Sequence, residues 1–479
     1  MQQFDHFING KNTPPENGEY LAVINPCNGQ QIASIARGNG ADVDKALKSS
    51  EDAFKPWSKK TMAERVALQH KAADAMRSNI EDLAQTISSE LGRPLEGCYR
   101  EIERSADLLD YYAEEALRLK GEIPMMNVEG EKVLIIRQPI GVVVSITPFN
   151  YPITLLVLKI GAALAVGCTV TSKPAEDTPL STLKLARLFH EAGFPHGVFN
   201  VITGKGREIG DELVAHKIPR KITFTGGTSV GQRIAKIAAD TNKRVTLELG
   251  GQSPAIVCED ADIAEAAKAI AKHAFANSGQ FCYRVNRVYA HQNIYDQFMS
   301  LLCAEVEQFK VGDVADRSCT HGPLVNEKIF KTSDEQSKDA RLKGADFKVG
   351  GHRLLGGIYD KGYYFAPTVI GNTSHDMQIM TEETFGPVLG VMKFESLDDA
   401  INLANDSIFG LAAYVFSKDI GKCIQLSETL EAGSVWVNKI QRSYHLAPFG
   451  GVKQSGMGRE KSVHGLEEYT ELKTIYLNY

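Results

Sequence analysis

The stretch GVVVSITPFNYPITLLVLKIGAALAVGCTVTSKP, residues 141–174, contains three apolar runs. The first and third runs are short and rich in valine and threonine, which is typical of buried strands, and the middle run is long enough for a core helix. A strand, a helix and a second strand in this order form the repeating unit of a parallel sheet. Pro148, Asn150, Pro152 and Lys159 interrupt the apolar segment, so it does not predict a membrane span.

The same alternation continues on both sides of this stretch. Helical spacing of apolar residues is found at 62–91, 100–118 and 229–241. Strand-like runs occur at VLIIRQ (133–138), GVFNVITG (197–204), KITFTGG (221–227) and RVTLELGG (244–251). After Gly251 the pattern begins again with SPAIVCED (253–260) and a helix over 261–277. The sequence therefore predicts an α/β protein with two parallel-sheet units.

Two further segments alternate like exposed strands. They are residues 119–139 and the tail EEYTELKTIYLNY (467–479). Exposed strand edges are rarely left unpaired in native proteins. We therefore expect the two segments to pair with each other and with a partner subunit.

Bulk composition excludes several classes of function. The 479 residues include 53 basic and 59 acidic side chains, without long runs of one sign, so the charge gives no case for a nucleic-acid partner. The eight cysteines form no CxxC pair and no zinc-ligand pattern, and such usage favours a reducing compartment. The N-terminal residues MQQFDHFING lack the pattern of a signal peptide. We expect a cytoplasmic protein without a bound metal or a membrane partner.

Glycine-rich turns follow two of the predicted strands. VITGKGREIG (201–210) carries Gly206 and Gly210, and FTGGTSVG (224–231) carries Gly226 and Gly227 before a helix that begins near residue 228. A helix start of this kind offers free N–H groups to a pyrophosphate, but each stretch alone is equally compatible with a tight turn.

Eight motifs, in a fixed order, identify the chain as resembling the NAD(P)-dependent aldehyde dehydrogenase superfamily over essentially its whole length. They are TPFNYP (147–152), SKPAEDTP (172–179), FTGGTSVG (224–231), LELGG (247–251), NSGQFC (277–282), EETFGPV (382–388), GSVWVN (433–438) and PFGGVKQSGMGRE (448–460).

The resemblance implies two Rossmann-like domains and a small β element for oligomerisation. Residues 1–118 and 140–250 would form the dinucleotide-binding domain, and 251–460 the catalytic domain. Residues 119–139 and 461–479 would supply the oligomerisation strands of a homodimer or homotetramer.

The resemblance also implies a catalytic set. Cys282 would attack the aldehyde and carry first a thiohemiacetal and then a thioester, Asn150 would hold the oxyanion, and Glu248 would activate the hydrolytic water. A glutamate at 248 favours hydrolysis over transfer of the acyl group to coenzyme A. Lys159 resembles an auxiliary lysine of the site. The alternative interpretation is that Lys159 lies at a helix edge and its ammonium group reaches solvent. Viewed alone, Cys282 would be a buried apolar thiol and Glu248 an exposed strand residue.

The implied cofactor is NAD, with NADP possible. Glu176 would accept the adenosine ribose hydroxyls and repel a 2′-phosphate, whereas Lys173 partly offsets that repulsion. Gly227 stands where many members of the family have serine. The complete set of expected cofactor contacts is Ile146, Thr147, Pro148, Lys173, Glu176, Gly206, Gly210, Gly226, Gly227, Val230, Leu249, Glu383 and Phe385.

The substrate is a small aldehyde, and its identity is less well indicated. Succinate-semialdehyde dehydrogenases resemble this chain closely, but they place arginines where it has Leu158 and Ala276. Ser443 matches the pocket serine of that group. Arg284 and Arg442 would offer positive charges from another direction. In the alternative interpretation, Arg284 pairs with a structural carboxylate and Arg442 faces solvent. A broad-specificity enzyme for apolar or aromatic aldehydes is the alternative. The expected pocket comprises Leu155, Leu158, Phe281, Tyr283, Arg284, Arg442, Ser443 and Phe449, with the loop 439–447.

Overall fold

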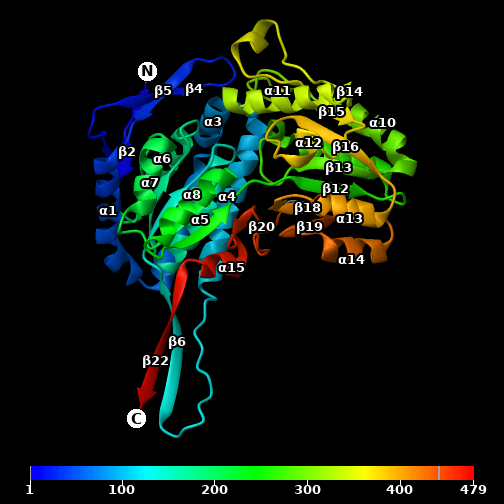
Figure 1. Cartoon of the computed structure of the whole chain (residues 1–479). Coiled ribbons are helices and arrows are strands. Elements are labelled where there is room, and N and C mark those ends of the chain that lie inside the picture. Colours follow the sequence, from blue (N-terminus) through cyan, green and yellow to red (C-terminus); the bar gives the residue numbers. More distant parts are fainter. Residues whose placement is uncertain (1, 441–442) are drawn as a thin grey trace.

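Two sheets covered by helices form the body of the chain, and a two-stranded ribbon projects from it (Figure 1). The computed structural model describes residues 2–440 and 443–479. Most strands of both sheets run parallel, with helices between successive strands, so the predicted α/β class is confirmed. Across these described residues, no helix has both the length and the apolar character needed to cross a membrane.

The first sheet is built around the strand that opens the 141–174 stretch. Its five central strands are parallel. The chain order changes direction between β7 and β10, and such a switch point is where open parallel sheets bind ligands. In spatial order the eight strands are β21 (Gly456–Met457), β11 (Arg244–Glu248), β10 (Lys221–Thr225), β7 (Val142–Ile146), β8 (Thr169–Lys173), β9 (Phe199–Val201), β2 (His6–Ile8) and β3 (Lys11–Thr13).

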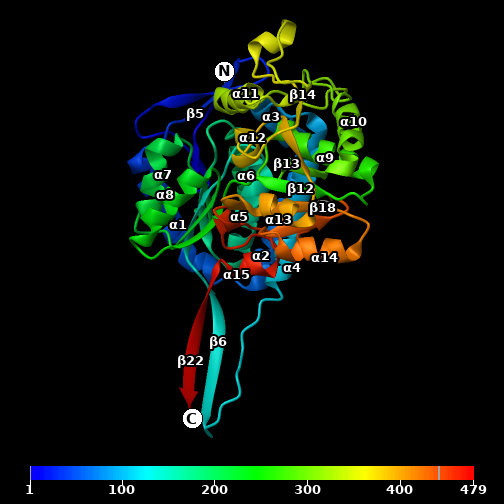
Figure 2. The ribbon, with the colours of Figure 1, turned by 45° about the vertical axis from the view of Figure 1, so that its right-hand side comes forward.

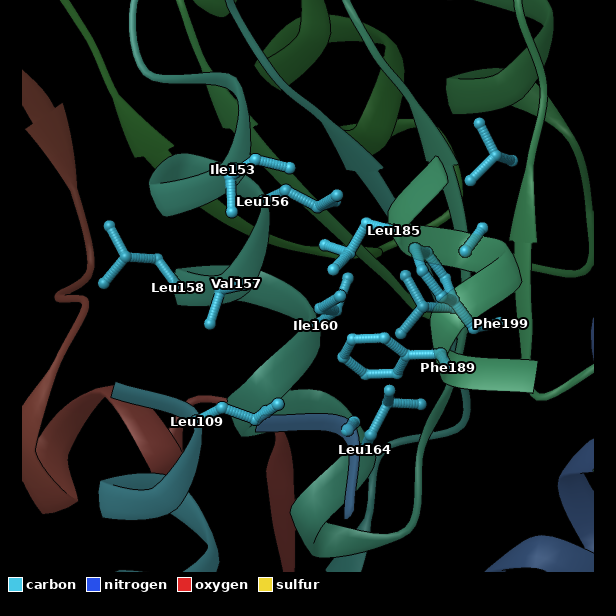
Figure 3. Packing of buried hydrophobic residues seen from close by; sticks show 14 of the residues in the cluster. Leu109, Ile153, Leu156, Val157, Leu158, Ile160, Leu164, Leu185, Phe189 and Phe199 are labelled. Atoms are coloured by element: carbon cyan, nitrogen blue, oxygen red, sulfur yellow. The ribbon is translucent and has the colours of Figure 1, made fainter. Parts of the chain in front are cut away.

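Helix α5 (Pro152–Val166) is apolar on all sides and is the centre of the first core. Such a helix must be buried all round, and Figure 3 shows its leucines and isoleucines packed among Leu109, Leu185 and Phe189. The other helices of this half are α1 (Gly40–Ser58), α2 (Met62–Ser78), α3 (Ile80–Leu91), α4 (Leu95–Ala116), α6 (Leu180–Glu191), α7 (Gly206–Ala215) and α8 (Thr228–Ala239).

The single helix predicted over 62–91 is wrong, because the chain breaks at Asn79. The Asn79 side-chain amide donates to the carbonyl of Ala75 at 2.8 Å and closes α2, and α3 starts at the next residue. Asparagine competes well for backbone groups in this way. The break lets α3 leave the direction of α2.

The second sheet holds six parallel strands and the antiparallel edge strand β14. In spatial order they are β14 (Asp346–Val349), β15 (Thr368–Gly371), β16 (Val388–Phe394), β13 (Val285–His291), β12 (Ser253–Val257), β18 (Ala412–Phe416) and β19 (Ser434–Val437). The helices on its faces are α9 (Ile263–Phe275), α10 (Tyr295–Val306), α11 (Glu327–Leu342), α12 (Gln378–Thr381), α13 (Leu397–Asn405) and α14 (Ile420–Thr429).

The projecting ribbon consists of β6 (Glu131–Pro139) and β22 (Thr470–Asn478), which pair antiparallel over nine positions. It stands clear of the body in both views (Figures 1 and 2). Thus the predicted pairing with the tail is confirmed for Glu131–Pro139, whereas residues 119–130 form no strand and contribute only the isolated bridge between Glu122 and Ile135. The strand character expected of 461–479 does not begin at once, because residues Ser462–Glu467 form the helix α15.

Two smaller sheets complete the described part of the fold. A three-stranded sheet near the N-terminus contains β1 (Gln2–Phe4), β5 (Gln31–Ala36) and β4 (Tyr20–Ile24). A short pair is formed by β17 (Phe409–Gly410) and β20 (Val452–Lys453). Through β20 and β21, the segment 452–457 runs from the second half of the chain to the edge of the first sheet, where β21 pairs with β11.

Candidate active site

The predicted active-site residues lie where the two sheets face each other. Asn150 follows β7 and Glu248 ends β11, so both are at the carboxyl edge of the first sheet. Cys282 precedes β13 and Glu383 precedes β16, which places them at the amino edge of the second sheet. The chain joins these edges directly between β11 and β12. A Cβ atom on Gly251 in that connection would lie 2.5 Å from the carbonyl oxygen of Cys282, so the two segments touch.

A sharply bent loop presents Cys282. Helix α9 ends at Phe275, and Asn277, Ser278 and Gly279 all adopt left-handed φ angles of 51°, 54° and 77°. Non-glycine residues rarely adopt this conformation, and at functional sites the surrounding structure holds them in it. The side chain of Asn277 donates to the carbonyl of Asn150 at 3.2 Å, and Ser278 Oγ donates to that of Gly322 at 2.8 Å. These bonds fix the loop against both halves of the chain.

Cys282 is partly exposed, whereas five of the other seven cysteines are buried. Burial of the thiol raises the pKa of Cys282, and the carboxylates of Glu248 and Glu383 raise it further. The backbone N–H groups of Cys282 and Tyr283 act in the opposite direction and lower the pKa. The protein alone therefore keeps this thiol protonated at neutral pH, and a positive charge bound nearby would be needed to favour the thiolate.

Glu248 is only 3% exposed, and neither of its carboxylate oxygens has a hydrogen-bond partner among the described residues. Burial and the negative charge of Glu460 raise the pKa of Glu248 well above its ordinary value, while Lys159 lowers it. A Cβ on Gly450 would lie 2.7 Å from Glu248 Oε1, so glycine leaves space beside the carboxyl group. The interpretation of Glu248 as an exposed strand residue is wrong. Its free oxygens and raised pKa suit a group that accepts a proton from water.

Lys159 is completely buried on α5, so the interpretation of this residue as a lysine that reaches solvent is also wrong. Its ammonium group donates to Thr225 Oγ1 at 2.7 Å and forms an ion pair with Glu460. Sequence reasoning did not assign a role to Glu460. The signal was its place at the end of the PFGGVKQSGMGRE motif, which folds back beside β11.

Hydrogen bonds hold the backbone carbonyl of Asn150, whereas its side-chain oxygen accepts none from the described residues. The Asn150 carbonyl accepts from Arg93 Nη1 at 3.3 Å as well as from Asn277. Arg93 is itself paired with Glu101 and lies over the ring of Tyr151. The side-chain oxygen of Asn150 is buried without a partner among the residues described. The other half of this amide, the Nδ2 donor, is the group that the resemblance assigns to the oxyanion.

The predicted cofactor residues gather at the switch point of the first sheet. Thr147 N–H donates to the carbonyl of Lys173 at 3.1 Å, and Lys173 forms an ion pair with Glu176 at 3.6 Å. Helix α8 begins after Gly227 without a side-chain cap, and the buried hydroxyl oxygens of Thr147 and Thr228 have no partner within residues 2–440 and 443–479. Free helix N–H groups and orphaned hydroxyls are what a bound pyrophosphate and ribose would satisfy.

The remaining cofactor predictions fall into two groups. Ile146, Pro148, Gly226, Val230 and Leu249 lie at the same edge, with Val230 half exposed on α8. Gly206 and Gly210 lie in α7, and no atom stands within 4 Å of a Cβ at either position, so packing does not require glycine there.

Glu383 and Phe385 stand opposite this edge. A Glu383 carboxylate oxygen accepts the N–H of Gly251 at 3.0 Å, and burial raises the pKa of Glu383 to about 7. The ring of Phe385 packs edge-on against Phe149 at 5.8 Å between centroids. Both residues thus approach the carboxyl ends of the first sheet.

Several aromatic side chains lie beside Cys282. Tyr283 packs against Phe281 and Phe449, with centroid distances of 5.1 Å and 5.3 Å, and stacks with Trp436 at 6.0 Å. Tyr151 contacts Phe281 edge-on at 6.5 Å. Leu155 and Leu158 come from α5, and Figure 3 shows Leu158 directed away from Leu185 and Phe199. We call Tyr151, Phe281, Tyr283 and Phe449 the aromatic wall.

The assignment of Arg284 to the substrate pocket is wrong. Its side chain is 0% exposed and donates to three backbone carbonyls, from Ala274 at 2.8 Å, Thr384 at 3.2 Å and Val388 at 2.9 Å. Burial lowers the pKa of Arg284 to about 9. Arg284 is thus structural, although it binds carbonyls rather than a carboxylate. Arg442 lies outside the described residues.

Ser443 has a partner that the sequence did not indicate. Its hydroxyl oxygen accepts a hydrogen bond of 3.0 Å from Lys461 Nζ. Among the described residues, no group of three or more metal-ligating side chains is placed to hold a metal ion.

Comparisons with known proteins agree with this geometry. The sequence pattern of the aldehyde dehydrogenase family matches residues 13–475. A mitochondrial succinate-semialdehyde dehydrogenase of Oryza sativa is 42% identical over 98% of this chain and 88% of the relative. A 3-sulfolactaldehyde dehydrogenase of Pseudomonas putida is 39% identical over 98% of this chain and 96% of the relative. The solved structure of a 3,6-anhydro-L-galactose dehydrogenase in complex with NAP superposes with a TM-score of 0.98 at 37% identity, covering all of both chains.

Proposed function

The chain belongs to the aldehyde dehydrogenase family, and we propose that it oxidises a small semialdehyde with a distal anionic group to the corresponding acid. One observation carries the catalytic part of this proposal: Asn150, Glu248 and Cys282, from distant parts of the sequence, meet where the two sheets face each other. The substrate class is supported by relatives named for succinate semialdehyde and 3-sulfolactaldehyde, both of which carry an anionic tail.

The first step forms a bond between Cys282 Sγ and the aldehyde carbon. The thiol releases its proton to water, and the carbonyl oxygen becomes an alkoxide that the Asn150 amide and the Cys282 N–H would hold. Removing one such donor typically costs about 3–4 kcal/mol of barrier. The chemistry that NAD(P)+ supplies when bound is to accept the hydride that leaves the adduct.

The second step breaks the bond to sulfur. Glu248 takes a proton from a water molecule, and that water attacks the thioester carbon, releasing the acid and the thiolate. No residue in the described part of the chain bonds to the Glu248 oxygens, which leaves both available to orient this water. Transfer to coenzyme A would need no such base, so a hydrolytic reaction is favoured.

Residues at the switch point of the first sheet would hold the cofactor. The free N–H groups of α8 would hold the pyrophosphate, Glu176 the adenosine ribose, and Glu383 the nicotinamide ribose. Because Glu176 is paired with Lys173, both NAD and NADP can be accepted. The ribbon of β6 and β22 would join two subunits of a homodimer or homotetramer, in a cytoplasmic enzyme.

The apolar character of the pocket favours a second candidate. The aromatic wall and Leu158 would suit an apolar or aromatic aldehyde. A panel of aldehydes decides between the two, with formation of NADH and NADPH as the readout and coenzyme A added in a parallel series. We expect the highest kcat/KM with succinate or glutarate semialdehyde, free acid as the product, and no effect of coenzyme A. A preference for benzaldehyde or hexanal would support the second candidate instead.

A further inference from the structure

Lys461 brings a positive charge to the aromatic wall. Its Nζ donates to Ser443 Oγ at 3.0 Å and lies 5.4 Å from the centre of the Phe449 ring. Burial lowers the pKa of Lys461 to about 8, and the negative charges of Glu460, Cys282 and Glu248 act against this shift. The ammonium group therefore shares the space of the proposed catalytic residues rather than pointing to bulk solvent.

No described carboxylate forms an ion pair with Lys461. The neighbouring Glu460 is engaged by Lys159, and Arg104 on α4 adds a second positive charge that lowers the pKa of Lys461, Tyr151 and Tyr283. Charged groups that are withdrawn from solvent are normally paired. Within the part of the chain that the structure describes, this partly buried cation has only a serine hydroxyl as its hydrogen-bond acceptor, which leaves it able to bind an anion.

The backbone at Lys461 is the second, independent observation. Its φ and ψ angles are 61° and 174°, a region that essentially only glycine adopts. The Lys461 N–H is held in place by Tyr112 Oη at 3.1 Å. A lysine side chain at a position that favours glycine is costly, and such outliers cluster at ligand-binding sites.

We propose that Lys461, together with Ser443, binds the distal anionic group of the aldehyde substrate and thereby determines specificity. This inference rests on the proposed function, since it names the residue that recognises the anionic tail of that substrate class. The sequence pointed to Arg284 and Arg442 for this task, but Arg284 is turned into the core. With the aldehyde carbon at Cys282, the substrate chain would run along the aromatic wall and its carboxylate or sulfonate would reach Lys461 Nζ and Ser443 Oγ.

The test compares succinate semialdehyde with butanal, which has the same number of carbon atoms and no charge. Lys461→Met removes the charge and keeps most of the side-chain length, and Lys461→Gly also removes the backbone strain. We expect either variant to raise KM for succinate semialdehyde about tenfold to several hundredfold, the range for truncating one partner of a partly desolvated charge pair. The values of kcat with both aldehydes and KM for butanal should change less than about threefold, since uniform binding alone is lost.

Two controls separate this effect from misfolding and from overall charge. Lys461→Gly should melt at the wild-type temperature or above it, because glycine adopts this backbone without strain. Lys418→Met removes the same charge from an exposed position and should leave both aldehydes unaffected. Ser443→Ala should raise KM for succinate semialdehyde by a smaller factor than Lys461→Met. Succinate, as a competitive inhibitor, should weaken in parallel with the substrate.

Three results would overturn the inference, and they are distinguishable. If the wild type does not prefer succinate semialdehyde to butanal, the proposed substrate class fails and the inference fails with it. If the preference exists but survives in Lys461→Met and Lys461→Gly, the proposed function stands and another residue recognises the anion. If both variants lose activity equally with both aldehydes, Lys461 acts on the chemistry at Cys282 and not on the substrate tail.

Discussion

The buried ammonium group of Lys159 is paired with the carboxylate of Glu460, and both charges act on the same neighbour, Glu248. Glu460 raises the pKa of Glu248 and Lys159 lowers it, so their effects partly cancel. Burial remains the largest cause of the raised pKa. The pair therefore supports a proposed base whose proton affinity is set mainly by its removal from water.

Lys159→Met should both destabilise the protein and shift its pH profile. It leaves the carboxylate of Glu460 buried and unpaired, which typically costs about 3–5 kcal/mol. It also removes the charge that lowers the pKa of Glu248, so the hydrolytic step should reach half its maximum at a higher pH. Denaturant unfolding and pre-steady-state kinetics measure the two effects. Lys159→Met/Glu460→Leu should recover much of the stability, and a double variant as unstable as the single one would argue against the pairing energy.

Cys282 should react slowly with iodoacetamide at pH 7 and faster as the pH rises. The thiolate is the reactive form, and burial with the nearby carboxylates raises the pKa of Cys282, so thiolate appears only in the alkaline range. Addition of NAD+ should increase the rate. Mass spectrometry of the labelled peptide follows the reaction, with Cys282→Ala as the control, which should also lack dehydrogenase activity. Labelling that is already complete and independent of pH from 6 to 8 would show that the thiolate forms without help.

Glu248→Gln should slow hydrolysis of the thioester more than its formation. Glutamine cannot accept a proton from water, whereas attack by Cys282 does not need this side chain as a hydrolytic base. A burst of NADH followed by slow turnover is expected, with the steady-state rate reduced about 10²–10⁴-fold. The wild-type hydrolysis rate should rise with pH, because the carboxylate form of Glu248 becomes populated only above its raised pKa. Equal loss of the burst and the steady state would place Glu248 in an earlier step.

Glu176→Ser should favour NADP+ over NAD+. The Glu176 side chain is 47% exposed and is paired with Lys173, so its repulsion of a 2′-phosphate is partly screened. Removing it frees Lys173 to bind that phosphate, and the ratio of kcat/KM values for NADP+ over NAD+ should rise about three- to tenfold, less than for a fully buried charge. Glu16→Ser is a matched control, because the Glu16 side chain is also 47% exposed and is paired with a lysine, Lys45, away from the predicted cofactor contacts. An unchanged ratio would remove Glu176 from the ribose site.

The sequence was sufficient where a residue is identified by a local motif. The motifs around Asn150, Glu248 and Cys282 predicted three side chains that the fold brings together, and the strand at 221–227 and its following helix were placed within two residues of β10 and α8. Local patterns failed where a single side chain competes for the backbone. Asn79 splits a helix that apolar spacing alone made continuous.

The same limit explains Lys461 and Arg284. The residue types around Lys461 do not predict its positive φ angle. The residue is held by contacts with residues distant in the sequence, through its N–H to Tyr112 and its side chain to Ser443. The direction of Arg284 is likewise set by tertiary structure. Residues 281–284 form a turn before β13, so strand alternation does not apply to Tyr283 and Arg284, and the carbonyls that hold the guanidinium group come from α9 and from residues 384 and 388.

Arg284→Ala should therefore affect stability rather than specificity. The guanidinium group of Arg284 joins the end of α9, through Ala274, to the segment between Glu383 and β16, through Thr384 and Val388. Truncation leaves three buried carbonyls without this donor, at about 1–3 kcal/mol for each unsatisfied group, and it loosens the loop that carries Cys282. Thermal unfolding should show a large loss of stability, and kcat should fall by a similar factor with succinate semialdehyde and butanal. Arg284→Lys, which retains a charge but has fewer donors, should be intermediate. A selective rise in KM for the charged aldehyde, at unchanged stability, would return Arg284 to the pocket and contradict the orientation described for it.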